Sequence, residues 1–334
     1  NHMIEIDGQH AGGQLLRTAL SLSAATGKAF EITKIRGQRQ ERGLKPQHLT
    51  AVHAMQKLCN ADLQGDNIGS NDLVFKPNEI KGGSFTFDIG TAGSTILILQ
   101  TLIPACLREE KSSTFTIKGG TDTLWCPGSM YFQNVFCNFM EKIGINIDFH
   151  VEKYGFYPKG NGIVACTVKP CVQLNNINFA ERGSLKSMNA NVIVSNDLQK
   201  RNVLERIMKG FKENFNEPID INSQYVDTHS TGGFIHANVR YENYNVGADV
   251  IGERTKRAED IGKECAEKIK LLTQSDGVDK YAADQLMVYM GLKRSGSVKS
   301  VEITDHIKTN AQVIEKFLPV KFTIKSQLIR CEPR

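Results

Sequence analysis

The sequence predicts an α/β protein built of helices layered on sheets (α+β layers), because one order of elements recurs along the chain. Each unit starts with an amphipathic helix and continues with two strand-like segments. The clearest helix has apolar residues at positions 132, 135, 136, 139, 140 and 143, the spacing of a buried helical face. Apolar and polar residues then alternate over 145–151, as in a half-buried strand. Such units favour mostly antiparallel or mixed sheets covered by helices.

The other elements follow from the same two periodicities, bounded by glycine, proline and polar turns. In chain order, we expect a strand at 3–6, a helix opening near 14, a helix at 49–58, strands at 73–75 and 85–89, a helix at 96–107, a strand at 115–118, the helix at 132–143, strands at 145–151 and 163–168, a helix at 203–211, strands at 233–239 and 246–251, helices at 258–269 and from 281, and a strand at 301–303 before a helix at 311–318. The apolar stripes are interpreted as core.

The middle of the chain differs in composition from the rest. Residues 181–275 are richer in Asn, Lys and Glu and poorer in glycine turns. We therefore predict a large domain of repeated α/β units formed by 3–181 and 276–334, with a smaller α/β domain, 182–275, inserted into it.

Composition excludes several classes of protein. The 334 residues include 40% apolar and 23% charged residues, as in globular proteins, and no apolar run reaches the roughly 18 residues of a membrane span. The net charge of +5 permits a nucleic-acid or nucleotide partner without requiring one. The eight cysteines form no Cys-x-x-Cys and no zinc-type spacing. We expect a reduced, cytoplasmic protein with no membrane partner.

The segment from Thr304 to Asn310 is the most informative for chemistry. His306 follows a strand-like run and precedes a helix-like run, and Thr309 and Gln312 have capping-box spacing, so the helix is expected to begin just after the histidine. A helix N-terminus attracts anions, and an imidazole there could attack, or transfer a proton to, a phosphate. The alternative is a polar turn residue.

Two further segments are candidates for binding phosphate. Glycines between Asp7 and Gly13 lead into a helix that carries Gln14 and Arg17, and arginine can grip an oxyanion with two hydrogen bonds. The loop at 35–48 places Arg36 and Arg39 close together. The alternatives are a structural strand-to-helix turn and a solvated charged loop.

Other turns could serve a nucleotide. Glycine-rich turns lie at 89–95 and 119–122, and the single tryptophan, Trp125, follows with Pro127. This pair could flank a flat base or fill the edge of a core. Tyr281 and Asp284 share one face of a helix, where Asp284 either orients a histidine or belongs to a capped helix start.

Together these segments resemble the RNA 3′-terminal phosphate cyclase family. The matching pieces, in family order, are Asp7-Gly8 with Gly12 to Arg17, Ile35 to Leu49 with Arg36, Arg39 and Gly43, Gly90 to Ser94, Gly119 to Asp122, Gly155 to Gly162, Glu181 to Gly183, Gly252 to Arg254, Tyr281 to Leu286, and His306 with Thr309-Asn310. Each piece is weak alone, whereas nine in order over nearly the whole chain are specific. The resemblance implies a large domain of repeated α/β units with a smaller insert.

The resemblance also implies an activity: ATP-dependent conversion of an RNA 3′-phosphate to a 2′,3′-cyclic phosphate, a ligase-type reaction that releases pyrophosphate and AMP. His306 would carry AMP as the nucleophile, with Asp284 near it, and the substrate would be RNA with a 3′-phosphate end. Phosphates would be held by Gln14, Arg17, Arg36, Arg39 and Gln47. The ATP site would be lined by Gln100, Pro127, Tyr281, Ala282, Ala283, Asp284 and Gln285. A divalent metal, Mg²⁺ or Mn²⁺, would assist pyrophosphate departure.

The sequence departs from the family pattern at the expected metal position. His10 and Ala11 stand where the family usually has a metal-binding glutamate and a third glycine, and Glu41-Arg42 replaces a common Lys-Pro. Histidine is a poorer ligand for magnesium than a carboxylate and a better one for manganese or zinc. We therefore assign His10 to the metal position as a hypothesis.

Three alternatives remain beside an RNA-end-modifying enzyme. A cyclase-like RNA-binding or assembly protein could have kept the scaffold without turnover, which the departure at His10 would explain. A relative could adenylate other polynucleotide ends. Enolpyruvyl transferases share a related fold but need neither ATP nor the histidine.

Overall fold

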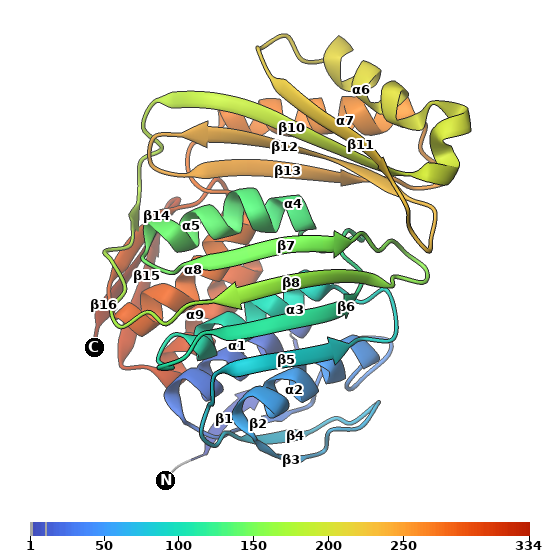
Figure 1. Ribbon diagram of the computed structural model, residues 1–334. Helices are drawn as coiled ribbons and strands as arrows, with labels where there is room; N and C mark the ends of the chain where they lie inside the picture. Colours follow the sequence, from blue (N-terminus) through green and yellow to red (C-terminus); the bar gives the residue numbers. More distant parts are fainter. Residues whose placement is uncertain (1–2, 11) are drawn as a thin grey trace.

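The computed structural model describes residues 3–10 and 12–334; Ala11, part of the N-terminal glycine-rich segment, lies outside the described residues. The α/β class is confirmed: helices and mixed sheets alternate in layers (Figure 1). Among the described residues, no helix has the length and apolarity needed to cross a bilayer.

The first two sheets share one topology. In the first unit the elements are β1 (Ile4–Asp7), α1 (Gly13–Thr26), β2 (Phe30–Thr33), α2 (Pro46–Cys59), β3 (Asp62–Gln64) and β4 (Leu73–Lys76). In the second they are β5 (Gly83–Asp88), α3 (Thr95–Leu102), a 3₁₀ turn (Ile103–Cys106), β6 (Ser113–Gly119), α4 (Ser129–Tyr131), a π-helical turn (Phe132–Phe136), α5 (Cys137–Lys142), β7 (Ile147–Lys153) and β8 (Gly162–Val168). The strand orders are β1-β2-β4-β3 and β5-β6-β8-β7, and in each sheet the first pair is parallel and the others antiparallel.

A third unit repeats this order around a long interruption. It consists of β9 (Asn178–Phe179), α8 (Lys280–Lys293), β14 (Gly296–Lys299), α9 (Asp305–Phe317), β15 (Val320–Lys325) and β16 (Leu328–Pro333), with strand order β15-β16-β14-β9. Between β9 and α8 the chain forms a fourth sheet, β11-β10-β12-β13. Its elements are β10 (Leu185–Ser195), a 3₁₀ turn (Asn196–Arg201), α6 (Val203–Glu213), β11 (Asp220–Val226), β12 (Gly233–Tyr241), β13 (Asn245–Ile251) and α7 (Ala258–Gln274). We propose that 182–275 is the inserted domain, because this sheet interrupts the third βαβαββ unit.

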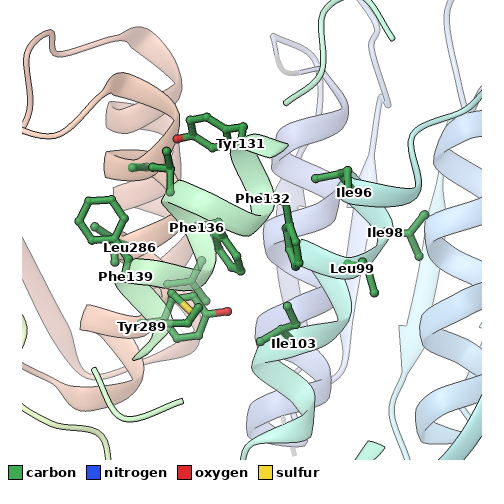
Figure 2. Close-up of a cluster of buried hydrophobic side chains, with 14 of the residues drawn as sticks. Ile96, Ile98, Leu99, Ile103, Tyr131, Phe132, Phe136, Phe139, Leu286 and Tyr289 are labelled. Carbon is green, nitrogen blue, oxygen red and sulfur yellow. The ribbon is translucent and has the colours of Figure 1, made fainter. Parts of the chain in front are cut away.

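The helices between the sheets form the core. Along 132–143 the residues of the apolar stripe are all buried, as their spacing predicts. Figure 2 shows Phe132 and Phe136 of this run lying between α3 and α8, and their rings stack with centroids 5.0 Å apart. The core also reaches the fourth sheet, since the Phe139 ring lies 5.3 Å from that of Tyr244, in the turn between β12 and β13.

Several expected elements differ from the structure. The strand expected at 301–303 was wrong, because β14 ends at Lys299 and 301–303 has no regular secondary structure. The helix expected over 96–107 ends at Leu102 and continues as a 3₁₀ turn that contains Pro104, because proline has no backbone N–H to donate. The helix expected after His306 begins before it, at Asp305.

Candidate active site

The N-terminus of α1 gathers the predicted phosphate-binding side chains. Gly12 is the N-cap and Gly13 opens the helix. A Cβ atom on Gly13 would lie 2.8 Å from both Nη1 of Arg17 and Nε2 of His48, and one on Gly12 would lie 3.5 Å from Nη2 of Arg39. Glycine at both positions therefore lets three nitrogen-bearing side chains close over the free N–H groups of the helix. The arrangement favours an anion.

His48 takes part in this site although its sequence motif gave it no role. It is buried, and its Nδ1 lies 3.1 Å from the backbone N–H of Lys45, which donates to it. Burial, together with the positive charges of Arg17, Arg36 and Lys45, lowers the pKa of His48 to about 4. The ring is neutral at pH 7 with its proton on Nε2, so it presents a hydrogen-bond donor at the α1 N-terminus.

The other predicted phosphate ligands are not equally placed. Gln14 accepts a hydrogen bond from Nη2 of Arg17 at 3.3 Å, so these two side chains act as a pair. Arg36 instead donates from Nη1 to the carbonyl of Glu41 at 2.8 Å and holds its own loop together. Gln47 is exposed in the first turn of α2. The structure thus joins Gln14, Arg17 and Arg39 more closely than Arg36 and Gln47.

His306 lies in the first turn of α9, so the prediction that the helix begins after it was wrong. Thr304 is the N-cap, and its Oγ1 accepts from the N–H of Ile307 at 3.2 Å. Thr309 and Gln312 have the spacing of a capping box but lie inside the helix. A histidine in a first helical turn stands beside free N–H groups, as the anion-site argument requires, and His306 is exposed.

The ends of α1 and α9 meet at the same side of the molecule. Lys28, just beyond α1, donates to the carbonyl of Phe317 at the end of α9. The two helices pack against each other and have 14 and 13 residues. Towards their N-terminal ends the helices are linked through α8, where Asp284 lies near Arg17 of α1 and accepts a hydrogen bond from Asn310 of α9. His306 and the phosphate-binding group of α1 therefore belong to the same edge.

Asp284 connects these two helices electrostatically. Its backbone carbonyl accepts from Nδ2 of Asn310 at 2.9 Å, one helical turn after His306. Burial raises the pKa of the Asp284 carboxyl to about 7, and the nearby guanidinium of Arg17 opposes that rise. Burial also lowers the pKa of Arg17, but the Asp284 charge counteracts this effect, and the guanidinium stays charged. Asp284 therefore gains or loses a proton near neutral pH.

The loop from Thr121 to Ser129 forms another side of the candidate site. Asp122 is buried, and its carboxylate accepts from the Ser129 N–H at 2.9 Å, the Ser129 hydroxyl at 2.8 Å and the Thr121 hydroxyl at 2.7 Å. Burial raises the pKa of Asp122 to about 6, and that of Cys126 is also raised by burial although the charge of Arg17 opposes the change. The Cys126 thiol is protonated at pH 7 and is no nucleophile.

The fourth sheet also holds this loop. Asp249 of β13 accepts from the N–H of Gly128 at 3.0 Å, directly after the half-buried Pro127. Its other oxygen lies 2.6 Å from Nδ1 of the buried His236 on β12. Residues more than a hundred positions apart thus fix the position of Pro127.

The remaining predicted nucleotide residues lie at the start of α8 and in α3. Asp279 caps α8 by accepting from the N–H groups of Tyr281 and Ala282, and its Oδ1 also accepts from the Tyr131 hydroxyl at 2.6 Å. The Tyr131 and Tyr281 rings meet edge to face, with centroids 6.4 Å apart. Ala282, Ala283 and Gln100 are buried, whereas Gln285 is half-buried. Since Tyr131 directly follows the Thr121–Ser129 loop, Tyr281 and Pro127 belong to neighbouring walls.

His10 does not lie in a cluster of metal-ligating side chains within the part of the chain that the structure describes. His10 is exposed, and its Nδ1 lies 2.9 Å from Oε1 of Gln38. Within 3–10 and 12–334, no group of three His, Cys, Asp or Glu residues has the arrangement of a metal site. The metal role of His10 stays a hypothesis.

The sequence is similar to a known protein family over nearly its whole length. The family model of RNA 3′-terminal phosphate cyclases matches residues 9–324. The chain belongs to this family. Relatives named RNA 3′-terminal phosphate cyclase include proteins of Sulfurisphaera tokodaii (40% identical, covering 97% of each chain), Methanococcoides burtonii (38%, 97% of each) and Pyrococcus furiosus (37%, 97% of this chain and 95% of the relative). The family is one of enzymes, and the match covers all the walls of the site described above.

Proposed function

We propose that the chain is an ATP-dependent RNA 3′-terminal phosphate cyclase that acts through an AMP–histidine intermediate at His306. The observation that supports this proposal is the shared end of the packed helices α1 and α9, where α9 carries an exposed imidazole and α1 an anion site built from Arg17, Arg39 and the neutral His48. The family membership supports the choice of ATP and an RNA 3′-phosphate as substrates.

Three displacements at phosphorus account for the reaction. A neutral ring nitrogen of His306 attacks the α-phosphorus of ATP, a P–N bond forms, and the bond to pyrophosphate breaks. An oxygen of the RNA 3′-phosphate then attacks the same phosphorus and displaces the imidazole. Finally the adjacent 2′-hydroxyl, losing its proton, attacks the 3′-phosphorus and expels AMP.

The protein's own groups stabilise the charge that develops in these steps. Arg17 and Arg39 offset phosphate charge, and the Nε2–H of His48 adds a neutral donor aimed at the same helix N-terminus. The Asp284 carboxyl offsets the charge of Arg17 when no phosphate is bound. Its backbone carbonyl orients the start of α9 by accepting from Asn310. Pro127 and Tyr281, with Gln100, Ala282, Ala283 and Gln285, would line the adenosine site. A divalent cation, where bound, would supply charge neutralisation to the polyphosphate, and no step here depends on protein ligands to it.

Covalent labelling tests this proposal. Purified protein is mixed with ATP labelled at the α-phosphate and with magnesium, manganese or cobalt, without RNA. We expect acid-labile label on the wild type and none on His306→Ala. A matched control, His53→Ala, removes an exposed histidine that pairs with Asp66 at 3.0 Å on another surface and should label normally.

Addition of RNA then tests the later steps. Label should transfer to oligonucleotides that end in a 3′-phosphate, giving a cyclic end and AMP, but not to those that end in a 3′-hydroxyl. Absence of label with all three metals, together with retained RNA binding, would replace the proposal with a cyclase-like RNA-binding protein without turnover. Transfer to other phosphate ends at a higher rate would identify a different polynucleotide substrate.

A further inference from the structure

The single tryptophan is exposed beside the site and does not fill a core. Trp125 has 93% of its surface exposed, compared with 77% for Tyr157 and 53% for Tyr281. An indole left in water costs hydrophobic free energy, so this position is not explained by packing.

The backbone of Trp125 is also held in an unfavourable conformation. Its φ angle is +69°, in the left-handed region that bulky side chains rarely adopt. Such conformations persist only where the surroundings impose them, and they gather at functional sites. The segment that follows Trp125 is held by Asp249, which accepts from the Gly128 N–H, and by Asp122, which accepts from Ser129.

The residue after Trp125 lies close to Arg17 of the predicted phosphate-binding group. The Cys126 thiol is near enough to Arg17 for the guanidinium to oppose the burial effect on its pKa, and it lies against Ser94, the N-cap of α3. Trp125 is therefore one residue from the wall that faces the bound phosphate, but on the solvent side of it. A nucleotide's base and its 3′-phosphate are separated by a single ribose, so both could be held at once.

We propose that Trp125 is a stacking platform for the 3′-terminal base of the RNA, an inference that rests on the proposed function. Aromatic stacking suits a substrate that is defined by its 3′-phosphate end and not by its sequence. Every base has a π-face, so RNA ends of any sequence can be held. The base is assigned to RNA and not to ATP because Trp125, at 93% exposed, lies further out in solvent than the ATP walls: Tyr281 is 53% exposed, Pro127 is half-buried and Gln100 is buried. A polynucleotide has to approach from solvent.

The protein itself carries the reporter for this proposal. All tryptophan emission comes from Trp125, because the chain contains one tryptophan. Titration with a short single-stranded RNA bearing a 3′-phosphate should quench this emission, and ATP alone should not. An RNA whose last nucleotide lacks its base should bind without quenching. Binding is followed separately by the anisotropy of a dye at the RNA 5′ end.

Variants of Trp125 measure how much stacking contributes to RNA affinity. Trp125→Ala should weaken RNA binding about 5- to 150-fold, the range for loss of one stacked base, while Trp125→Phe should keep most of the affinity. In Trp125→Ala, removing the terminal base of the RNA should weaken binding little further, because the variant and the abasic RNA each delete the same stacking contact. Leu124→Ala, a neighbour that is 39% exposed and has no π-face, is the matched control and should bind RNA nearly normally.

The outcomes separate this inference from the proposed function. Normal AMP labelling with wild-type RNA affinity in Trp125→Ala, or RNA bound by the wild type without quenching, would overturn the platform and leave the cyclase proposal standing. Quenching by ATP alone, with weaker labelling of Trp125→Ala at low ATP, would assign the stacked base to ATP and overturn the RNA assignment. A wild type that neither labels nor binds RNA would remove both proposals.

Discussion

Replacing Asp284 by asparagine should change how the stability of the protein depends on pH. The carboxyl has a folded-state pKa of about 7 because it is buried, compared with an ordinary value of 3.8. Between these values the folded protein binds a proton that the unfolded chain has released, so the free energy of unfolding falls as pH rises. The stability that protonated Asp284 contributes to the folded state is fully present below about pH 4 and is lost once the pH passes about 7.

The size of the effect follows from the two pKa values. At 1.36 kcal/mol for each pKa unit, an ionised Asp284 costs the fold about 4 kcal/mol, and about 2–3 kcal/mol of this loss falls between pH 5 and pH 8. Asparagine keeps the shape of the side chain and cannot ionise. The variant should therefore gain about 2–3 kcal/mol relative to the wild type as pH rises from 5 to 8.

Urea unfolding followed by circular dichroism at both pH values measures this difference. The comparison uses the change with pH, so a constant cost of the asparagine amide or of the lost charge beside Arg17 cancels. Asp220→Asn, at an exposed position on β11, should show no such change relative to the wild type. A constant difference between Asp284→Asn and the wild type at pH 5 and pH 8 would refute the burial argument.

Two other substitutions test the edges of the site. His10→Glu should raise magnesium-supported AMP labelling several-fold, because a carboxylate suits magnesium better than the imidazole that now meets Gln38; an unchanged or lower rate would show that His10 is not at the metal position. Asp249→Asn should weaken the contacts to His236 and Gly128, lower stability by about 1–3 kcal/mol and raise the KM for ATP more than it lowers kcat; an unaltered KM would mean that the Gly128 contact does not place the nucleotide wall.

Much of the fold could be predicted from local periodicity. The stripe over 132–143 is buried throughout, and the strands expected at 73–75, 163–168, 233–239 and 246–251 are present. These predictions succeed because burial of one helical face or alternate strand residues leaves its pattern within a few residues of sequence. The mixed α/β class follows from the order of the elements.

The helix boundary at His306 could not be predicted in this way. Thr304 and Thr309 are both suitable N-caps, and the sequence offers a better capping box at the second. The structure uses Thr304, where the chain leaves β14 and packs Ile307, fully buried, against the core. Tertiary burial of the first turn thus outweighs a local capping preference.

The role of Asp249 had no local signal at all, and it changes how the insert relates to the active site. The aspartate lies on β13 and accepts from Gly128, 121 positions earlier in the chain. Without that acceptor, the N–H after Pro127 would lose its partner three residues from Trp125. Both the second repeated unit and the fourth sheet thus contribute acceptors to the segment that follows Pro127. The loop that carries Pro127 and Trp125 is therefore held from the fourth sheet as well as from its own unit, a long-range contact that no local sequence pattern could reveal.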